Sequence, residues 1–156
     1  MIAMSKDLGT NLTGEMEKYL NAEKANAVLA TLRPGDGWPH TTPIYLIKVK
    51  NSGQLLFALA AGHQASANLL DNGKAMLSIM GEKDQAYSIE MKVRQLKPAM
   101  DGNAAMSAFI GDITAIKSDT TPTVIVEAGV KAKYRSDKTE AFFRMMFDEL
   151  VKEGKK

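Results

Sequence analysis

The sequence predicts a mainly β domain in which antiparallel strands are flanked by helices. Three apolar runs of strand length follow one another at residues 27–32, 40–49 and 55–59. The turns between them are short, whereas parallel neighbours need a crossover of about a dozen residues, so the three runs favour an antiparallel meander. Amphipathic patterns before and after this region add the helices.

A short helix is expected ahead of the first strand. Leu12, Met16 and Leu20 recur at helical spacing. Asn11 or Thr13 can cap this helix, because a short polar side chain at its start accepts a hydrogen bond from a free amide of the first turn.

Glycine marks the turns of the meander. The first run stops at Pro34 and Gly35, and the second stops before Gly53. Proline presets one turn dihedral, and glycine adopts the positive φ that other residues resist. A short helix at residues 64–71 then precedes a fourth strand at residues 75–80. Gly73 is placed to end that helix in the left-handed conformation.

The region from residue 82 to residue 121 leaves the number of elements open. Residues 89–93 alternate between apolar and charged, as a half-buried strand does, and residues 109–116 are another strand candidate. Residues 103–109 are rich in alanine and methionine, which is compatible with a helix. Residues 123–134 again have a strand pattern, in which Gly129 indicates a bulge or bend.

The clearest helix is predicted over residues 137–151. Asp137 and Glu140 have the spacing of a capping box. An apolar stripe runs along one face, formed by Phe143, Met146, Phe147 and Leu150 and widened by Phe142. A face this wide covers either the barrel of its own chain or a second subunit, and it motivates the expectation of a homodimer.

Composition indicates one globular domain over residues 1–156, with 45% hydrophobic and 24% charged residues. The formal charge of +2 is spread along the chain, which argues against nucleic-acid binding. No segment approaches the ~20 apolar residues of a membrane span, and the first residues lack the apolar core of a signal peptide. A cytoplasmic protein with no membrane partner is expected.

The candidate chemistry begins with the only two histidines. His40 stands at the start of the second strand, and His63 stands just before the short helix. His40 is either a ligand contact or an ordinary strand-end residue, and His63 is either an anion contact or simply the residue at a helix start. Because the chain has no cysteine and neither histidine has the neighbours of a metal site or a nucleophile triad, no metal is expected.

Several segments follow one another in a distinctive order. They are Ala27-Val28-Leu29-Ala30-Thr31 before a glycine turn, Pro39-His40-Thr41-Thr42-Pro43-Ile44-Tyr45, Leu55-Leu56-Phe57-Ala58, and Gly62 through Asn68-Leu69. This order resembles the pyridoxamine 5'-phosphate oxidase-like flavin-binding split barrels, over residues 12–80 and more weakly over residues 123–150. The resemblance implies a six-stranded antiparallel split β-barrel that dimerises and holds FMN in a groove between its subunits.

The resemblance also implies where FMN would bind. Residues 40–45 would lie along the flavin ring and ribityl chain, with residues 57 and 58 on the next strand, and the start of the short helix would hold the phosphate. The implied cofactor-binding residues are His40, Thr41, Thr42, Pro43, Ile44, Tyr45, Phe57, Ala58, His63, Gln64, Ala65 and Asn68. No catalytic residue is assigned.

The activity implied by the resemblance is that of an FMN-dependent oxidoreductase of unknown substrate. Its partner would be a small molecule or a protein redox partner, and the flavin would supply the redox chemistry. Many relatives have Arg and Lys, or Lys and Thr, where this chain has Gln64 and Ala65. The alternative is therefore a split barrel that has lost flavin and serves as a binding or regulatory module. A related ligand such as a deazaflavin or heme is a third hypothesis.

Overall fold

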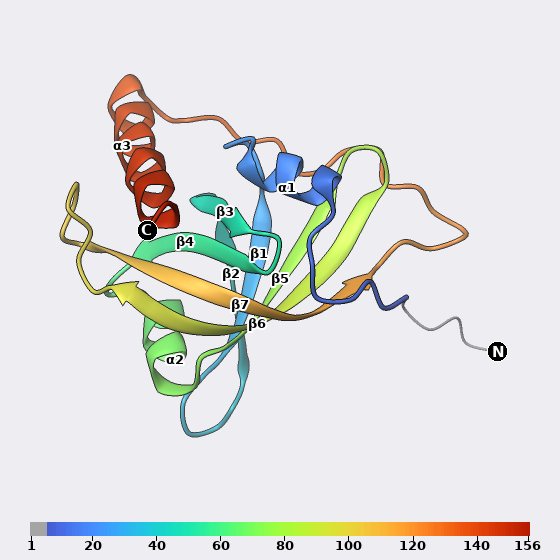
Figure 1. The fold of residues 1–156 in the computed structure, drawn as a ribbon, viewed down its shortest axis with the longest axis horizontal. Coiled ribbons are helices and arrows are strands. Elements are labelled where there is room, and N and C mark those ends of the chain that lie inside the picture. The colour runs from blue at the N-terminus through green and yellow to red at the C-terminus, as the bar shows by residue number, and fades with distance from the viewer. Residues whose placement is uncertain (1–5) are drawn as a thin grey trace.

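The structure, a computed structural model, describes residues 6–156, which form seven β-strands and three α-helices (Figure 1). The strands are β1 (Ala27–Leu32), β2 (Pro39–Ile44), β3 (Ile47–Asn51), β4 (Gln54–Ala60), β5 (Lys74–Gly81), β6 (Gln85–Lys97) and β7 (Met106–Ser118), and the helices are α1 (Gly14–Asn21), α2 (Gln64–Asn72) and α3 (Asp137–Gly154). The part of the chain that the structure describes is mainly β with flanking helices, as predicted, and has seven strands in place of six.

All seven strands belong to one antiparallel sheet in the order β2-β1-β5-β6-β7-β4-β3. β2 and β3 follow each other in the chain, yet they stand at the two ends of this order. The sheet bends strongly, and the short connection between β2 and β3 joins its two ends (Figure 1). This architecture agrees with the split barrel implied by the resemblance.

The predicted strand at residues 40–49 is wrong in one respect, because it is two strands with a corner between them. Ile44 and Ile47 face the large core inside the sheet, whereas Leu46 is buried in a second core beneath α3. In one continuous strand Ile44 and Leu46 would share a face. The change of face allows β2 to pair with β1 and β3 to pair with β4.

The predicted strand at residues 123–134 is also wrong. These residues lie in an irregular segment between β7 and α3, residues 119–136, here called the strap. The strap does not join the sheet, although Val126 exchanges two hydrogen bonds with Asp84, each of 2.9 Å. Residues 89–93 and 109–116 lie in β6 and β7 as predicted. Residues 103–109 contain a turn and the start of β7, not a helix.

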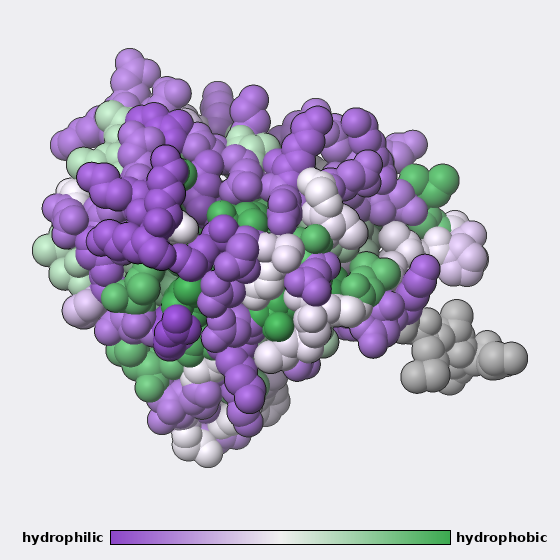
Figure 2. Space-filling view, viewed as in Figure 1, coloured by the Kyte–Doolittle hydropathy of each residue, from purple (hydrophilic) through white to green (hydrophobic). Residues whose placement is uncertain are grey.

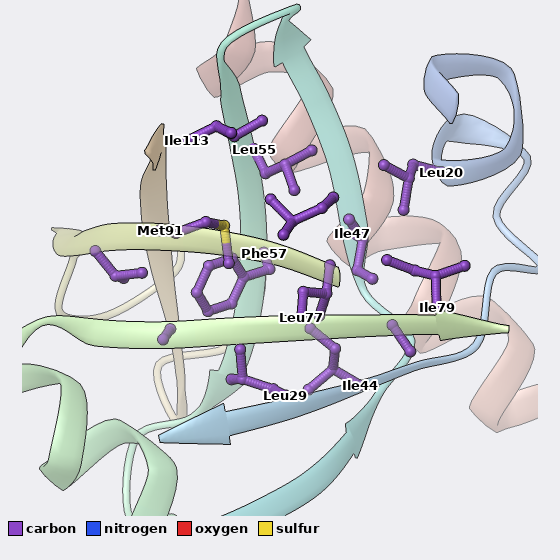
Figure 3. Close-up of a cluster of buried hydrophobic side chains, with 14 of the residues drawn as sticks. Leu20, Leu29, Ile44, Ile47, Leu55, Phe57, Leu77, Ile79, Met91 and Ile113 are labelled. Atoms are coloured by element: carbon purple, nitrogen blue, oxygen red, sulfur yellow. The ribbon is translucent and has the colours of Figure 1, made fainter. Parts of the chain in front are cut away.

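The large core fills the inside of the bent sheet (Figure 3). Phe57 of β4 stacks on Phe109 of β7 with ring centroids 5.7 Å apart. α1 closes one end of this core with Met16 and Leu20. Its N-cap is Thr13, one of the two predicted caps, whose hydroxyl accepts a hydrogen bond of 3.2 Å from the amide of Met16.

α3 covers the outside of β3 and β4. Met146, Phe147 and Leu150 are buried there, so the predicted apolar stripe packs on the sheet of its own chain. The N-cap is Ser136, one residue before the predicted Asp137, because the hydroxyl of Ser136 accepts a hydrogen bond from the amide of Thr139. Within residues 6–156, none of the helices combines the length and apolar character that crossing a membrane requires.

Candidate functional site

A groove lies where the β2–β3 corner meets the end of β4. The hollow at its centre has a volume of about 180 Å³. Most of its wall is apolar, and its polar side chains are neutral. The lining residues are Thr42, Pro43, Ile44, Tyr45, Leu46, Ala58, Leu59, Ala60, His63, Met106 and Phe143.

The two histidines meet at the polar end of this groove. The rings of His40 and His63 make an edge-to-face contact, with centroids 5.6 Å apart and an interplanar angle of 68°. Nδ1 of His40 is buried and has no hydrogen-bond partner among the described residues. A buried polar atom without a partner is uncommon, and it identifies this end of the groove as a place where a ligand atom can bind.

The position of His63 follows from its role as the N-cap of α2. Its Nδ1 accepts a hydrogen bond of 3.1 Å from the amide of Ala65. We infer from this bond that the hydrogen of the neutral ring is on Nε2. His63 therefore offers the groove a neutral N–H donor. Because the cap uses the amide of Ala65, that amide is not free to bind a ligand.

Asn68 joins α2 to the sheet. Its side chain is fully buried, and its Nδ2 donates to the hydroxyl of Thr31 on β1 at 2.9 Å. Its Oδ1 accepts from Nε2 of Gln64 at 2.7 Å. Since both ends of the Asn68 amide are used, this residue holds α2 and His63 in place and is not available to a ligand.

The structure brings together half of the residues implied by the resemblance. Those that line the hollow are Thr42, Pro43, Ile44, Tyr45, Ala58 and His63, and His40 contacts His63. Thr41 lies on the exposed face of β2, and Gln64 is exposed in the first turn of α2. The side chain of Phe57 is buried in the large core (Figure 3), and so is that of Ala65, and neither lines the groove.

Five lining residues were not expected from the sequence: Leu46, Leu59, Ala60, Met106 and Phe143. Met106 begins β7, and its approach to the end of β4 depends on a pairing between strands distant in sequence. Phe143 belongs to the apolar stripe of α3, and nothing in the stripe distinguishes it from its neighbours. No local pattern in the sequence points to either residue.

A larger hollow of about 520 Å³ lies between α3 and the connection from β6 to β7. Most of the charged groups around it are already paired. Arg144 binds Asp148 and Glu23, and Glu149 accepts hydrogen bonds of 2.8 Å from the amides of Asp101 and Gly102. These contacts tie α3 to the α1–β1 and β6–β7 connections, so we assign this hollow a structural role and take the groove as the candidate site.

Several solved structures share the fold of this chain. The structure is similar to that of a provisionally assigned pyridoxamine 5'-phosphate oxidase from Lactobacillus delbrueckii, with a TM-score of 0.61 and 17% identity over 71% of this chain and 98% of the other. It is similar to an FMN-binding protein from Syntrophomonas wolfei, with a TM-score of 0.56 and 11% identity over 67% of this chain and 84% of the other. It is also similar to an F420 reductase, with a TM-score of 0.55 and 18% identity over 67% of this chain and 97% of the other.

The sequence itself identifies the family. None of the curated proteins matches it. The family model described as pyridoxamine 5'-phosphate oxidase matches residues 12–149, which include every strand and the residues of the groove. This chain therefore belongs to the pyridoxamine 5'-phosphate oxidase family.

Proposed function

We propose that this protein binds FMN in the groove and acts as an oxidoreductase on a small molecule or a protein redox partner. The observation that carries the proposal is the groove itself, which has apolar walls and neutral hydrogen-bonding groups at one end. A flavin has matching chemistry, since its ring is flat and largely apolar and its edge and side chain are polar. Family membership and the printed names of two structural relatives, an FMN-binding protein and an F420 reductase, support the same ligand class.

The residues present fit the flavin ring. Pro43, Tyr45 and Ala58 offer apolar surface, and the hydroxyl of Thr42 lies among them as a polar contact. At the other end, Nε2 of His63 would donate to a ligand oxygen, and Nδ1 of His40 beside it is buried without a partner among the described residues. A bound flavin would supply the redox chemistry, while these residues would hold and orient it.

A second copy of the chain is part of the proposal. Pockets that enclose a drug-sized ligand usually have volumes of about 300–1,000 Å³. The hollow in one chain is smaller, at about 180 Å³. One chain therefore offers part of a flavin site, and a homodimer with the ligand between its subunits would complete it.

The alternative function is a binding or regulatory module without flavin. The groove has no lysine or arginine among its lining residues. A phosphate held by neutral donors alone lacks hydrogen bonds from a cationic Lys or Arg, and hydrogen bonds to charged groups contribute about 1.5–3 kcal/mol each. The neutral polar end thus favours a ligand without a phosphate, unless a cation of a second subunit reaches it.

The test is a visible absorbance scan of the purified protein, followed by titration with FMN while flavin fluorescence is recorded. We expect bound flavin or saturable quenching in the wild type, and loss of both in Ala60→Trp, which fills the groove. Ala61→Trp is the matched control, because Ala61 is exposed next to Ala60 but does not line the hollow. A colourless wild type that does not quench FMN would contradict the first proposal and support the alternative.

A further inference from the structure

The only tryptophan of the chain is exposed just before β2. The side chain of Trp38 is 66% exposed, whereas tryptophan is on average a well-buried residue. In Figure 1 the turn between β1 and β2 projects from the bottom of the molecule, and Figure 2 shows the same turn as a protrusion. The ring of Trp38 is therefore open to contact with another molecule.

Hydrogen bonds hold this turn in one shape. One carboxylate oxygen of Asp36 forms an ion pair of 2.6 Å with Arg33, and the other accepts a hydrogen bond of 3.0 Å from the amide of Trp38. The amide of Gly37 donates to the carbonyl of Arg33 at 3.1 Å, and the φ of Gly37 is 70°, which other residues resist. The backbone that presents the Trp38 ring is thus fixed in advance, which lowers the entropy lost when the ring binds a ligand.

The ladder between β1 and β2 extends as far as Trp38. Leu32 pairs in register with Pro39. One step further along, the amide of Arg33 donates to the carbonyl of Trp38 at 3.0 Å. This bond continues the ladder, so the alternation of side chains along β2 includes Trp38.

The alternation adds Trp38 to the row of β2 side chains at the groove. Side chains two residues apart in a strand point to the same face and are about 7 Å apart. Trp38 therefore shares a face with His40 and Thr42. Thr42 lines the hollow, and His40 meets His63 at its polar end. The row leads from the hollow, past the two histidines, to the ring of Trp38.

The neutral histidine end affects which kind of phosphate the groove accepts. His63 offers a neutral N–H donor there, and the described residues that line the hollow include no lysine or arginine. A terminal phosphate such as that of FMN has close to two negative charges at neutral pH, whereas a phosphate within a chain has one. Neutral donors are better suited to the second kind, and a ligand with phosphates inside its chain continues beyond the histidines.

We propose that the site extends to Trp38 and that its ring stacks on the adenine of FAD, while the flavin ring lies in the hollow. The order of flavin ring, phosphates and adenine along FAD matches the order of Thr42, His40 and Trp38 along β2. Stacking on an aromatic side chain needs no hydrogen bonds to the base, so one exposed ring is enough. The inference rests on the proposed function and deepens it: the groove accepts FMN, and FAD binds more tightly because its adenine reaches Trp38.

The test compares the dissociation constants of FMN and FAD, measured by equilibrium dialysis of the full chain with absorbance of the free flavin. We expect the wild type to bind FAD about tenfold more tightly than FMN. Trp38→Ala should lose this preference and keep the wild-type affinity for FMN, and Trp38→Phe should retain most of the preference because it keeps a flat ring. Val124→Ala is the control, since Val124 is also apolar and is 63% exposed but belongs to the strap.

Three results would overturn the inference: a wild type that binds both flavins equally, a Trp38→Ala variant that keeps the preference for FAD, and a Val124→Ala variant that loses it. Each of them leaves the proposed function intact, because FMN still binds. A protein that binds neither flavin contradicts the proposed function, and this inference with it. Circular dichroism of each variant checks that the fold is unchanged.

Discussion

Single residues were predicted best where their role depends on their neighbours in the chain. His63 before α2, Gly73 after it and Thr13 before α1 are all local features, and the structure confirms each one. The inward or outward orientation of Phe57 depends on the pairing of β4 with β7, so its burial against Phe109 was not visible in the sequence. The same is true of Phe143 in the groove.

Asn68 allows a prediction at this scale. Asn68→Ala removes the hydrogen bonds to Thr31 and Gln64 and leaves the Thr31 hydroxyl buried without its donor. We expect the free energy of unfolding to fall by about 1–3 kcal/mol in urea denaturation. Adding Thr31→Val to this variant should cost little more, because it removes the unpaired hydroxyl. A double variant whose loss equals the sum of the two single losses would show that the two side chains act independently.

At the scale of elements, the helices were predicted more accurately than the strands. Helix starts and ends are encoded locally by caps, and α2 ends at Gly73 as its sequence indicates. A strand forms only when it pairs with a neighbouring strand, and that pairing depends on residues that are distant in the sequence. For this reason the corner between β2 and β3 could not be recognised in the apolar run at 40–49. For the same reason the β-branched residues at 123–126 were predicted as a strand, although they lie in the strap outside the sheet.

The end of α2 provides a prediction for an element. Gly73 has a φ of 68°, and a Cβ there would be 2.7 Å from the carbonyl oxygen of Val93 on β6. Gly73→Ala should destabilise the protein by more than the about 1–2 kcal/mol of the left-handed conformation alone. Gly35→Ala is the matched control, since Gly35 has a φ of 83° with open space around it. Thermal unfolding that ranks the two variants equally would mean that the β6 carbonyl moves aside without cost.

At the scale of the whole molecule, one carboxylate connects three parts of the chain. Glu23, between α1 and β1, accepts hydrogen bonds of 2.6 and 2.7 Å from Arg144 of α3 and forms an ion pair of 2.7 Å with Lys48 of β3. Its backbone has a φ of 62°, which is rare for a residue other than glycine. The hydrogen bonds from Arg144, followed by those from Lys48, lower the pKa of Glu23 to about 2 despite its partial burial.

The lowered pKa predicts how stability depends on pH. In the unfolded chain Glu23 has an ordinary pKa, so its ion pairs stabilise the fold above about pH 5, and this contribution is lost as the pH falls toward 2. We expect Glu23→Gln to reduce the free energy of unfolding by about 1 kcal/mol at neutral pH. The difference from wild type should shrink steadily as the pH falls below 5. Glu82→Gln, in the exposed β5–β6 turn, is the control and should show no such trend.

The contact between Tyr134 and Phe143 connects the wall of the groove to the strap. Tyr134 belongs to the strap, and Phe143 belongs to the wall of the groove. In the homodimer proposed above the ligand would lie between the subunits, so a ligand that binds against Phe143 would also change the affinity of one chain for another. By thermodynamic reciprocity, association then changes the affinity for the ligand by the same factor. Ligand binding to this protein should therefore be cooperative with its assembly, and the apparent affinity should rise with protein concentration.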